Sequence, residues 1–189
     1  MPPKAAVAVR LLPDKSDPKR YFALFDLPAK LTLDAKDLEQ RYFRLSRQWH
    51  PDLFARKTDP ERAQALDQTA LLNDAYRVLR NPLKRAAYVA ASAEEAKPQA
   101  PPELLEEVFE LNMALEELRL GDQDVRPQLE QQQQSFLAAL QQQDRELEAL
   151  FPAYDAGSAS AADIQALLNR RKYIQNLVDE VEKALHARN

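Results

Sequence analysis

The sequence predicts an all-α protein, and three observations lead to that prediction. Glycine occurs only twice in 189 residues, so few positions have the backbone freedom that interrupts regular structure. Alanine, leucine, glutamate, glutamine and arginine are abundant, and these side chains lose little rotamer freedom in a helix. Apolar residues also recur at spacings of three and four along most of the chain, which is the period of an amphipathic helix.

Two short helices are expected to flank a hairpin of two long helices in the first half. Asp17-Pro18 begins the first short helix, with an N-cap residue and a proline at the first helical position, and Leu27-Pro28 ends it. Asp34 begins the second helix, whose apolar residues fall at helical spacing. The predicted buried face consists of Leu38, Tyr42, Leu45 and Trp49.

The third helix begins at Asp59-Pro60 by the same pattern of cap and proline. Asn81-Pro82 ends it, because a proline disfavours helical geometry in the residue before it. The apolar residues predicted to be buried in this helix are Ala63, Leu66, Ala70, Leu72, Tyr76 and Leu79. A shorter helix from Pro82 presents Leu83, Ala86, Ala87 and Val89.

A stiff polar linker is expected between the two halves of the chain. Three prolines and two acids occur between Glu94 and Pro102, with almost no large apolar side chain. The predicted organisation is therefore a flexible tail over 1–16, a first domain over 17–93, a linker over 94–101 and a second domain over 102–189. An organellar presequence remains an alternative for the tail, since it carries Lys4 and Arg10 and no acid before residue 14.

Three further helices are expected in the second domain. Gly121 ends the first of them, the second runs from about Val125 to Phe151, and Pro152, Gly157 and Ser158 mark the turn into the last. Their apolar stripes are Leu104, Val108, Leu111, Leu115 and Leu118; Leu129, Phe136, Leu140 and Leu147; and Ile164, Leu167, Ile174, Leu177, Val181 and Leu185. Such stripes can be buried only against one another, which predicts a three-helix bundle.

The composition excludes several classes of function. The chain has no cysteine, so thiolate metal sites are ruled out, and neither a phosphate-binding glycine loop nor a metal-ligand spacing of His and acids occurs. We therefore expect a non-enzymatic protein with no metal or other cofactor. The net charge of −4 argues against nucleic acid as a partner, and no apolar run reaches the roughly 20 residues that span a bilayer. The expected location is the cytoplasm, with the mitochondrial matrix as second choice.

His50-Pro51-Asp52 carries the strongest functional signal. It lies between the two long helices, where Pro51 would fix the backbone while His50 and Asp52 offer polar groups to a partner. The preceding helix adds a cationic face with Arg41, Arg44 and Arg47, which would speed docking to an acidic partner. The alternatives are a plain helix C-cap for His50 and an ordinary solvated face for the arginines.

This region resembles the J-domain, and the match is carried by Tyr42-Phe43-Arg44-Leu45-Ser46-Arg47-Gln48-Trp49-His50-Pro51-Asp52. The resemblance implies a co-chaperone that stimulates the ATPase of a seventy-kilodalton heat-shock chaperone. It further implies that Asp52 engages an arginine of that chaperone's nucleotide-binding domain.

The layout narrows the resemblance to the HscB family of iron-sulfur cluster co-chaperones. A helical domain follows the J-domain, and two segments are similar to this branch: Tyr21-Phe22-Ala23-Leu24-Phe25 and Asn81-Pro82-Leu83-Lys84-Arg85-Ala86-Ala87-Tyr88. The family implies two partners, an HscA-like chaperone and an IscU-like cluster scaffold protein that is delivered to it. A general J-domain co-chaperone for unfolded clients and a helical adaptor with a decayed J-like loop are the alternatives.

The first helix of the second domain has more apolar surface than one seam needs. Leu105, Phe109 and Met113 recur every fourth residue beside the seam, and an acid-flanked apolar strip is typical of a protein-binding face. The family resemblance implies that this face binds the scaffold. The residues assigned to it are Leu105, Glu106, Phe109, Glu110, Met113, Glu117 and, on the last helix, Tyr173. Packing of the strip into the bundle core or against the J-domain is the alternative.

Overall fold

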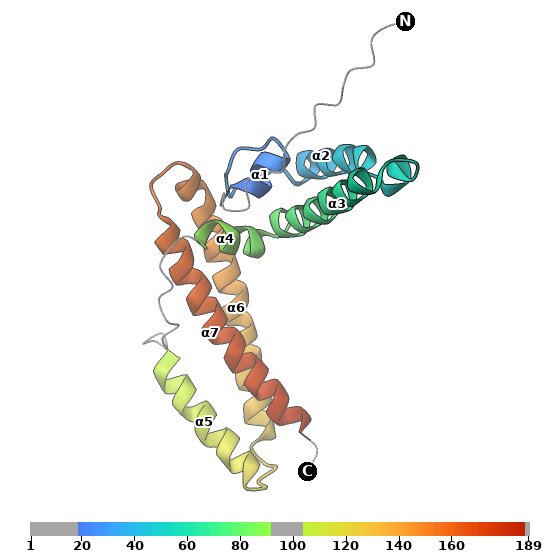
Figure 1. The fold of residues 1–189 in the computed structure, drawn as a ribbon. Coiled ribbons are helices and arrows are strands. Elements are labelled where there is room, and N and C mark those ends of the chain that lie inside the picture. Colours follow the sequence, from blue (N-terminus) through green and yellow to red (C-terminus); the bar gives the residue numbers. More distant parts are fainter. Residues whose placement is uncertain (1–18, 92–103, 188–189) are drawn as a thin grey trace, which may run out of the picture. The chain divides into compact units, whose positions relative to one another are not determined.

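The structure is a computed structural model that describes residues 19–91 and 104–187, and all regular structure within those ranges is helical. The all-α prediction is thereby confirmed. The chain divides into two compact units, Met1–Val89 and Ala90–Asn189. The helices are α1 (Arg20–Leu24), α2 (Ala35–Gln48), the 3-10 helix η1 (Pro51–Phe54), α3 (Asp59–Leu79), α4 (Pro82–Ala90), α5 (Leu105–Arg119), α6 (Arg126–Asp155) and α7 (Ala161–His186) (Figure 1).

Three predictions fall on other parts of the chain. The tail over 1–16, the helix start at Asp17-Pro18 and the linker over 94–101 lie outside the described residues. The domain limits set by that linker stay predictions.

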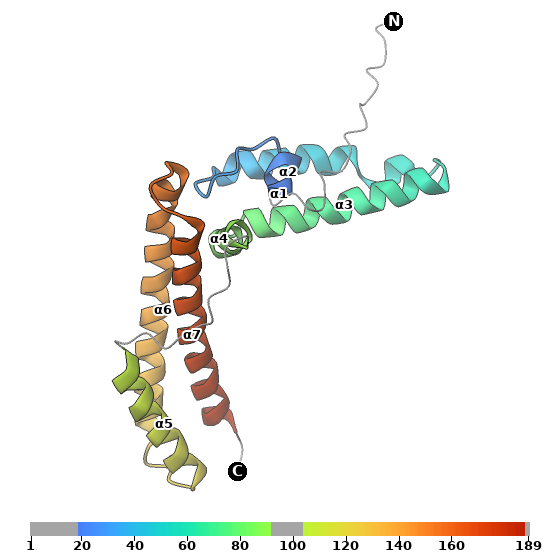
Figure 2. The same cartoon turned by 60° about the vertical axis from the view of Figure 1, so that its left-hand side comes forward.

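The first unit is built around the hairpin of α2 and α3, which lie side by side in both overall views (Figures 1 and 2). The Asp34 side chain caps α2 by accepting from the backbone N–H groups of Lys36 and Asp37 at 2.8 and 3.3 Å, which are groups that no helical carbonyl can reach. The core between the helices contains Phe22, Leu24, Phe25, Leu38, Leu72, Ala75 and Leu79.

The buried face of α3 differs from the prediction at its first turns. Leu72 and Leu79 are buried as expected, but Leu66 is 58% exposed, and Ala63 and Ala70 are exposed too. The buried stripe instead runs through Ala65, Gln68, Leu72, Ala75 and Leu79. The prediction failed there because Gln68 occupies a position that faces the core, while Leu66 faces solvent.

The second unit is a bundle in which α6 and α7 run alongside each other and α5 packs against both (Figures 1 and 2). Leu147 and Ile164 are buried outside the main core and Leu167 is partly buried, but the other predicted stripe residues meet in one core, as the periodicity predicts. Its buried residues are Leu104, Leu111, Ala114, Leu115, Leu118, Val125, Leu129, Phe136, Leu140, Ile174, Leu177, Val178 and Val181. Val108 and Leu185 are partly buried against it.

The end of α6 corrects one predicted boundary. Pro152 was expected to mark the turn, but it lies inside the helix, which continues to Asp155. A proline removes only its own N–H from the helical ladder, and its carbonyl remains able to accept. The Pro152 carbonyl accepts from the Ala156 N–H at 3.0 Å. The helical hydrogen bonds therefore continue through the last turn, which follows the buried Phe151.

A reciprocal capping box begins α7. The Ser160 hydroxyl accepts from the Asp163 N–H at 3.2 Å, and the Asp163 carboxylate accepts from the Ser160 N–H at 2.7 Å. The backbone bond from Ser160, and after it the bond from its hydroxyl, hold the pKa of Asp163 below its usual range. Hydrogen bonds from Thr58 likewise lower the pKa of Glu61 at the start of α3.

The Asp163 carboxylate should make the stability of the second unit dependent on pH. Because the folded state lowers its pKa, its contribution is complete above the ordinary carboxyl pKa of about 4 and is lost as the pH falls through the folded-state pKa. We expect Asp163→Asn to lower the melting temperature at pH 7 and to have much less effect near pH 3. Thermal unfolding at both pH values measures this, with Glu148→Gln, an exposed acid within α6, as control. An equal loss at both pH values would contradict the prediction.

Candidate functional site

The loop His50-Pro51-Asp52 projects its two polar side chains into solvent. His50 is the N-cap residue of η1, and its Nδ1 accepts from the Asp52 N–H at 3.4 Å. The Asp52 carboxylate lies 3.4 Å from the same nitrogen, and the side chains are 57% and 88% exposed. Pro51 supplies the fixed φ of the first helical position. The loop is therefore a short ordered turn with both polar groups accessible.

Aromatic and polar contacts hold the two ends of this loop. The Trp49 and Phe54 rings stack with centroids 5.8 Å apart and planes within 6°. The Thr69 hydroxyl of α3 donates to the Trp49 carbonyl at 3.0 Å. Since both ends are anchored to the hairpin, the exposed residues between them are presented in a fixed geometry.

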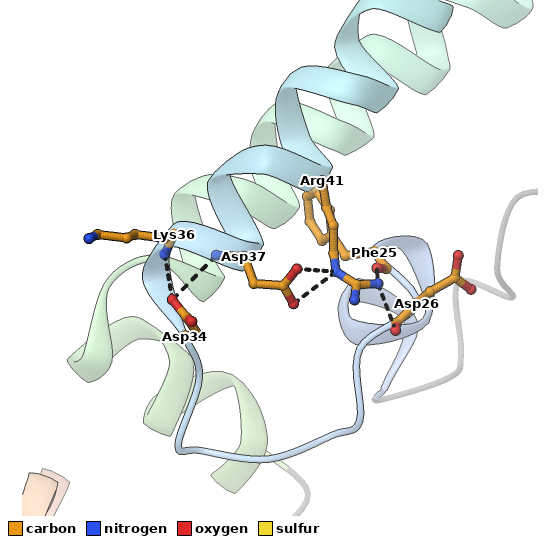
Figure 3. A network of polar contacts seen from close by, with 6 residues as sticks. All are labelled: Phe25, Asp26, Asp34, Lys36, Asp37 and Arg41. Atoms are coloured by element: carbon orange, nitrogen blue, oxygen red, sulfur yellow. Dashed lines mark hydrogen bonds and ion pairs between the residues drawn. The ribbon is translucent and has the colours of Figure 1, made fainter.

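The three predicted arginines have different surroundings. Arg44 and Arg47 are exposed on α2. The Arg41 guanidinium is paired with Asp37, whose carboxylate oxygens lie 2.9 and 3.0 Å from Nε (Figure 3). Arg44 and Arg47 therefore share a solvent-exposed face of α2, whereas Arg41 is partly buried and contacts other residues of the first unit.

Arg41 also fixes the turn that follows α1. Its Nη1 donates to the Phe25 and Asp26 carbonyls at 3.0 and 3.1 Å (Figure 3). Asp26 has φ of 53°, a left-handed conformation that costs energy for a residue with a Cβ. Hydrogen bonds to the carbonyls on this turn offset that cost, so Arg41 has a structural task that the sequence did not reveal.

An exposed aromatic side chain precedes Arg44 in the sequence and was not among the predicted site residues. Phe43 is 52% exposed, and its ring centroid lies 5.5 Å from that of Tyr42. Tyr42 in turn stacks on Tyr76 at 4.1 Å, and the Arg80 guanidinium lies 5.6 Å above Tyr76. The sequence did contain a signal for this residue: Phe43 directly follows Tyr42 of the buried face, which places an aromatic side chain on the polar side of α2.

The second candidate surface is the outward face of α5. Leu105, Phe109 and Met113 are 56%, 65% and 51% exposed, while the seam residues of the same helix are buried. These three side chains are named the α5 strip below. Glu106, Glu110 and Glu117 are exposed, and by helical spacing they follow one flank of the strip. Packing of the strip into the bundle core is thus excluded.

Tyr173 has a different environment from the other residues grouped with it. It belongs to α7 and is partly buried against the bundle core. Its ring therefore packs in part against the bundle core, and its role in scaffold binding stays a prediction.

No group of three or more His, Cys, Asp or Glu suited to a metal ion occurs among residues 19–91 and 104–187. Over the same ranges, none of the helices combines the length and the apolar character needed to cross a membrane.

Comparison with known proteins assigns both units. The DnaJ domain family matches residues 20–88, and the HSCB C-terminal oligomerisation domain family matches residues 100–182. The chaperone HscB from Vibrio cholerae is 30% identical, with a TM-score of 0.58, over 86% of this chain and 95% of that one. The human co-chaperone protein HscB shares the fold, with 23% identity and a TM-score of 0.63 over 90% and 83% of the two chains.

Proposed function

The chain belongs to the HscB family of J-domain co-chaperones, and from that premise we propose that it delivers an iron-sulfur cluster scaffold protein to a seventy-kilodalton heat-shock chaperone and stimulates ATP hydrolysis there. The observation that carries the proposal is the separation of two exposed surfaces. The His50-Pro51-Asp52 loop lies in one compact unit and the α5 strip lies in the other. The partners are an HscA-like chaperone and an IscU-like scaffold.

The loop acts on the chaperone. The exposed Asp52 carboxylate accepts hydrogen bonds from an arginine of the chaperone's nucleotide-binding domain, and charge-assisted bonds of this type are about twice as strong as neutral ones. His50 supplies a ring nitrogen and, through its contact with the Asp52 N–H at 3.4 Å, fixes the turn. Arg44 and Arg47 steer the approach of an acidic surface.

The α5 strip acts on the scaffold. Its three apolar side chains lose their exposure only when a partner covers them, and burial contributes about 25 cal/mol per Å² of apolar surface. Binding of the scaffold to one unit and of the chaperone to the other raises the effective concentration of scaffold at the chaperone. The chain itself performs no chemistry in this scheme.

Two measurements test the function as a whole. Single-turnover ATP hydrolysis by the chaperone, with and without this protein, separates a co-chaperone from a helical adaptor. Titration with a folded, cluster-free scaffold protein separates delivery of that scaffold from general assistance to unfolded clients. Absence of stimulation would remove the co-chaperone function, and absence of scaffold binding would remove the delivery function.

Arg44 and Arg47 should contribute to chaperone affinity through charge alone. We expect Arg44→Ala and Arg47→Ala each to weaken chaperone binding by roughly threefold at low salt, and to have less effect at physiological salt, where charges are screened over about 8 Å. Titrations at two ionic strengths measure this.

The matched controls are two other arginines. Arg145→Ala, an exposed position in α6, should leave chaperone affinity unchanged. Arg41→Ala should instead lower the free energy of unfolding by about 1 to 2 kcal/mol, because it removes the bonds to the α1 turn. Unchanged affinity at low salt for both Arg44→Ala and Arg47→Ala would show that this face does not touch the chaperone.

A further inference from the structure

Leu120 is the most exposed large apolar side chain in the part of the chain that the structure describes, at 80% of its full surface. It stands at the C-terminal end of α5, as the C-cap residue. A single exposed leucine is ordinary on a protein surface. Leu120 is of functional interest because of its position relative to the α5 strip.

Helix geometry places Leu120 on the same face as the strip. Its φ and ψ of −75° and −3° keep it within the helical region. Leu120 follows Met113 by seven residues, or about two turns, so the two side chains point in similar directions. Leu115 and Leu118, between them in sequence, are buried on the opposite side. Leu120, the C-cap residue, therefore adds an apolar side chain to the face of the strip, one turn beyond the exposed Glu116 and Glu117.

The fold does not require an apolar side chain at this position. The helix end is closed by its backbone, with Gly121 N–H donating to the Leu118 carbonyl at 3.1 Å and Asp122 N–H to the Glu117 carbonyl at 3.0 Å. Gly121 supplies the left-handed φ of 101° that this pair of bonds needs. Because the cap is complete without the Leu120 side chain, a polar residue would serve the helix equally well.

Acidic side chains accompany the extended face. Glu110 and Glu117 are exposed along one flank, and Glu116, between Met113 and Leu120, lies 3.6 Å from Arg119. A partner that covers this face must bring an apolar surface bordered by lysine or arginine. A second copy of the chain, packed with the same face against itself, would set its own glutamates opposite one another at the cost of like-charge repulsion.

We propose that Leu120 is a contact residue for the scaffold and that the binding face runs over the whole length of α5, which rests on the function proposed above. The scaffold surface that fits is apolar with a basic border. Leu120 forms the end of that contact farthest from Leu105, and the charged flank sets the orientation of the bound scaffold.

The test is titration of a purified, cluster-free scaffold protein with the full chain and with Leu120→Gln. We expect the variant to bind about tenfold more weakly and to unfold at the same temperature, since the side chain is exposed. Leu66→Gln replaces a leucine that is also more than half exposed, in the other unit, and should bind the scaffold as the unaltered chain does. Phe109→Ala is measured in parallel.

The possible outcomes separate this inference from the proposed function. Weaker binding by Phe109→Ala together with unchanged binding by Leu120→Gln would confine the face to the first turns of α5 and overturn the inference alone. A scaffold that does not bind the unaltered chain overturns both. A change in sedimentation behaviour with Leu120→Gln, at unchanged scaffold affinity, would assign the residue to contact between copies and overturn the inference as well.

Discussion

Replacing His50 with glutamine is expected to abolish stimulation of the chaperone ATPase while leaving helix content and scaffold affinity unchanged. The glutamine keeps a polar side chain but loses the ring nitrogen that contacts the Asp52 N–H at 3.4 Å. Because His50 is the N-cap residue of η1, its loss alters the presentation of Asp52 and not the core of the hairpin. Single-turnover hydrolysis at saturating co-chaperone measures stimulation, and circular dichroism measures helix content.

The chain offers a matched control for this substitution. His186, the second of the two histidines, is also exposed and lies at the end of α7 in the other unit. His186→Gln should stimulate the ATPase as the unaltered chain does. Full stimulation by His50→Gln would mean that the loop does not trigger hydrolysis, whereas a loss with both variants would point to a general effect of the substitution.

The sequence predicted most of the fold because the signals that begin and end its helices are local. Asp34 caps α2 as expected, and α3 begins one residue before its predicted start, with Thr58 as the N-cap and Asp59 and Pro60 in the first helical positions. Both starts depend only on neighbouring backbone groups. The bundle stripes were also predictable, since leucine and isoleucine at helical spacing have few alternatives to burial. Leu129, Leu147 and Ile164 are all buried as expected.

The failures have identifiable physical causes. Gln68 is 3% exposed and Leu66 is 58% exposed, which reverses the order that hydrophobicity predicts, because the packing of α3 against α2 and not side-chain polarity determines which positions face inward. Pro152 lies within α6 although a proline there loses a backbone bond, because the adjacent Phe151 is buried and the Pro152 carbonyl still accepts from the Ala156 N–H. In both cases tertiary contacts outweighed a local preference.

The helices that carry the predicted site residues follow from the sequence, but the contacts of those residues do not. Arg41, Arg44 and Arg47 share a helix face by spacing, yet the bond from Arg41 to the Phe25 carbonyl joins residues 16 positions apart and has no signature in a pattern of spacing. Tyr173 likewise could be placed on a helix, but its partial burial against the core depends on how the three helices pack.

Phe109 and Phe136 form a pair of substitutions that distinguishes a binding face from a core. Phe109 is 65% exposed in α5, whereas Phe136 is 1% exposed in α6. Phe136→Ala should lower the free energy of unfolding by about 3 to 5 kcal/mol, since it leaves a cavity in the bundle. Phe109→Ala should change it by less than about 1 kcal/mol, because the ring already contacts water.

Scaffold affinity should show the opposite order. Aromatic anchors that are buried on binding cost about 2 kcal/mol or more when truncated, which is roughly thirtyfold in the dissociation constant. We expect that loss for Phe109→Ala at a temperature where both variants are folded, and little change for Phe136→Ala. Stimulation of the chaperone's basal ATPase should be retained by Phe109→Ala, because the loop lies in the other unit. Thermal unfolding and scaffold titration of the two variants together decide whether Phe109 belongs to a binding face or to the core. A large fall in melting temperature for Phe109→Ala would assign its ring to packing within the protein. Unchanged scaffold affinity would remove Phe109 from the binding face.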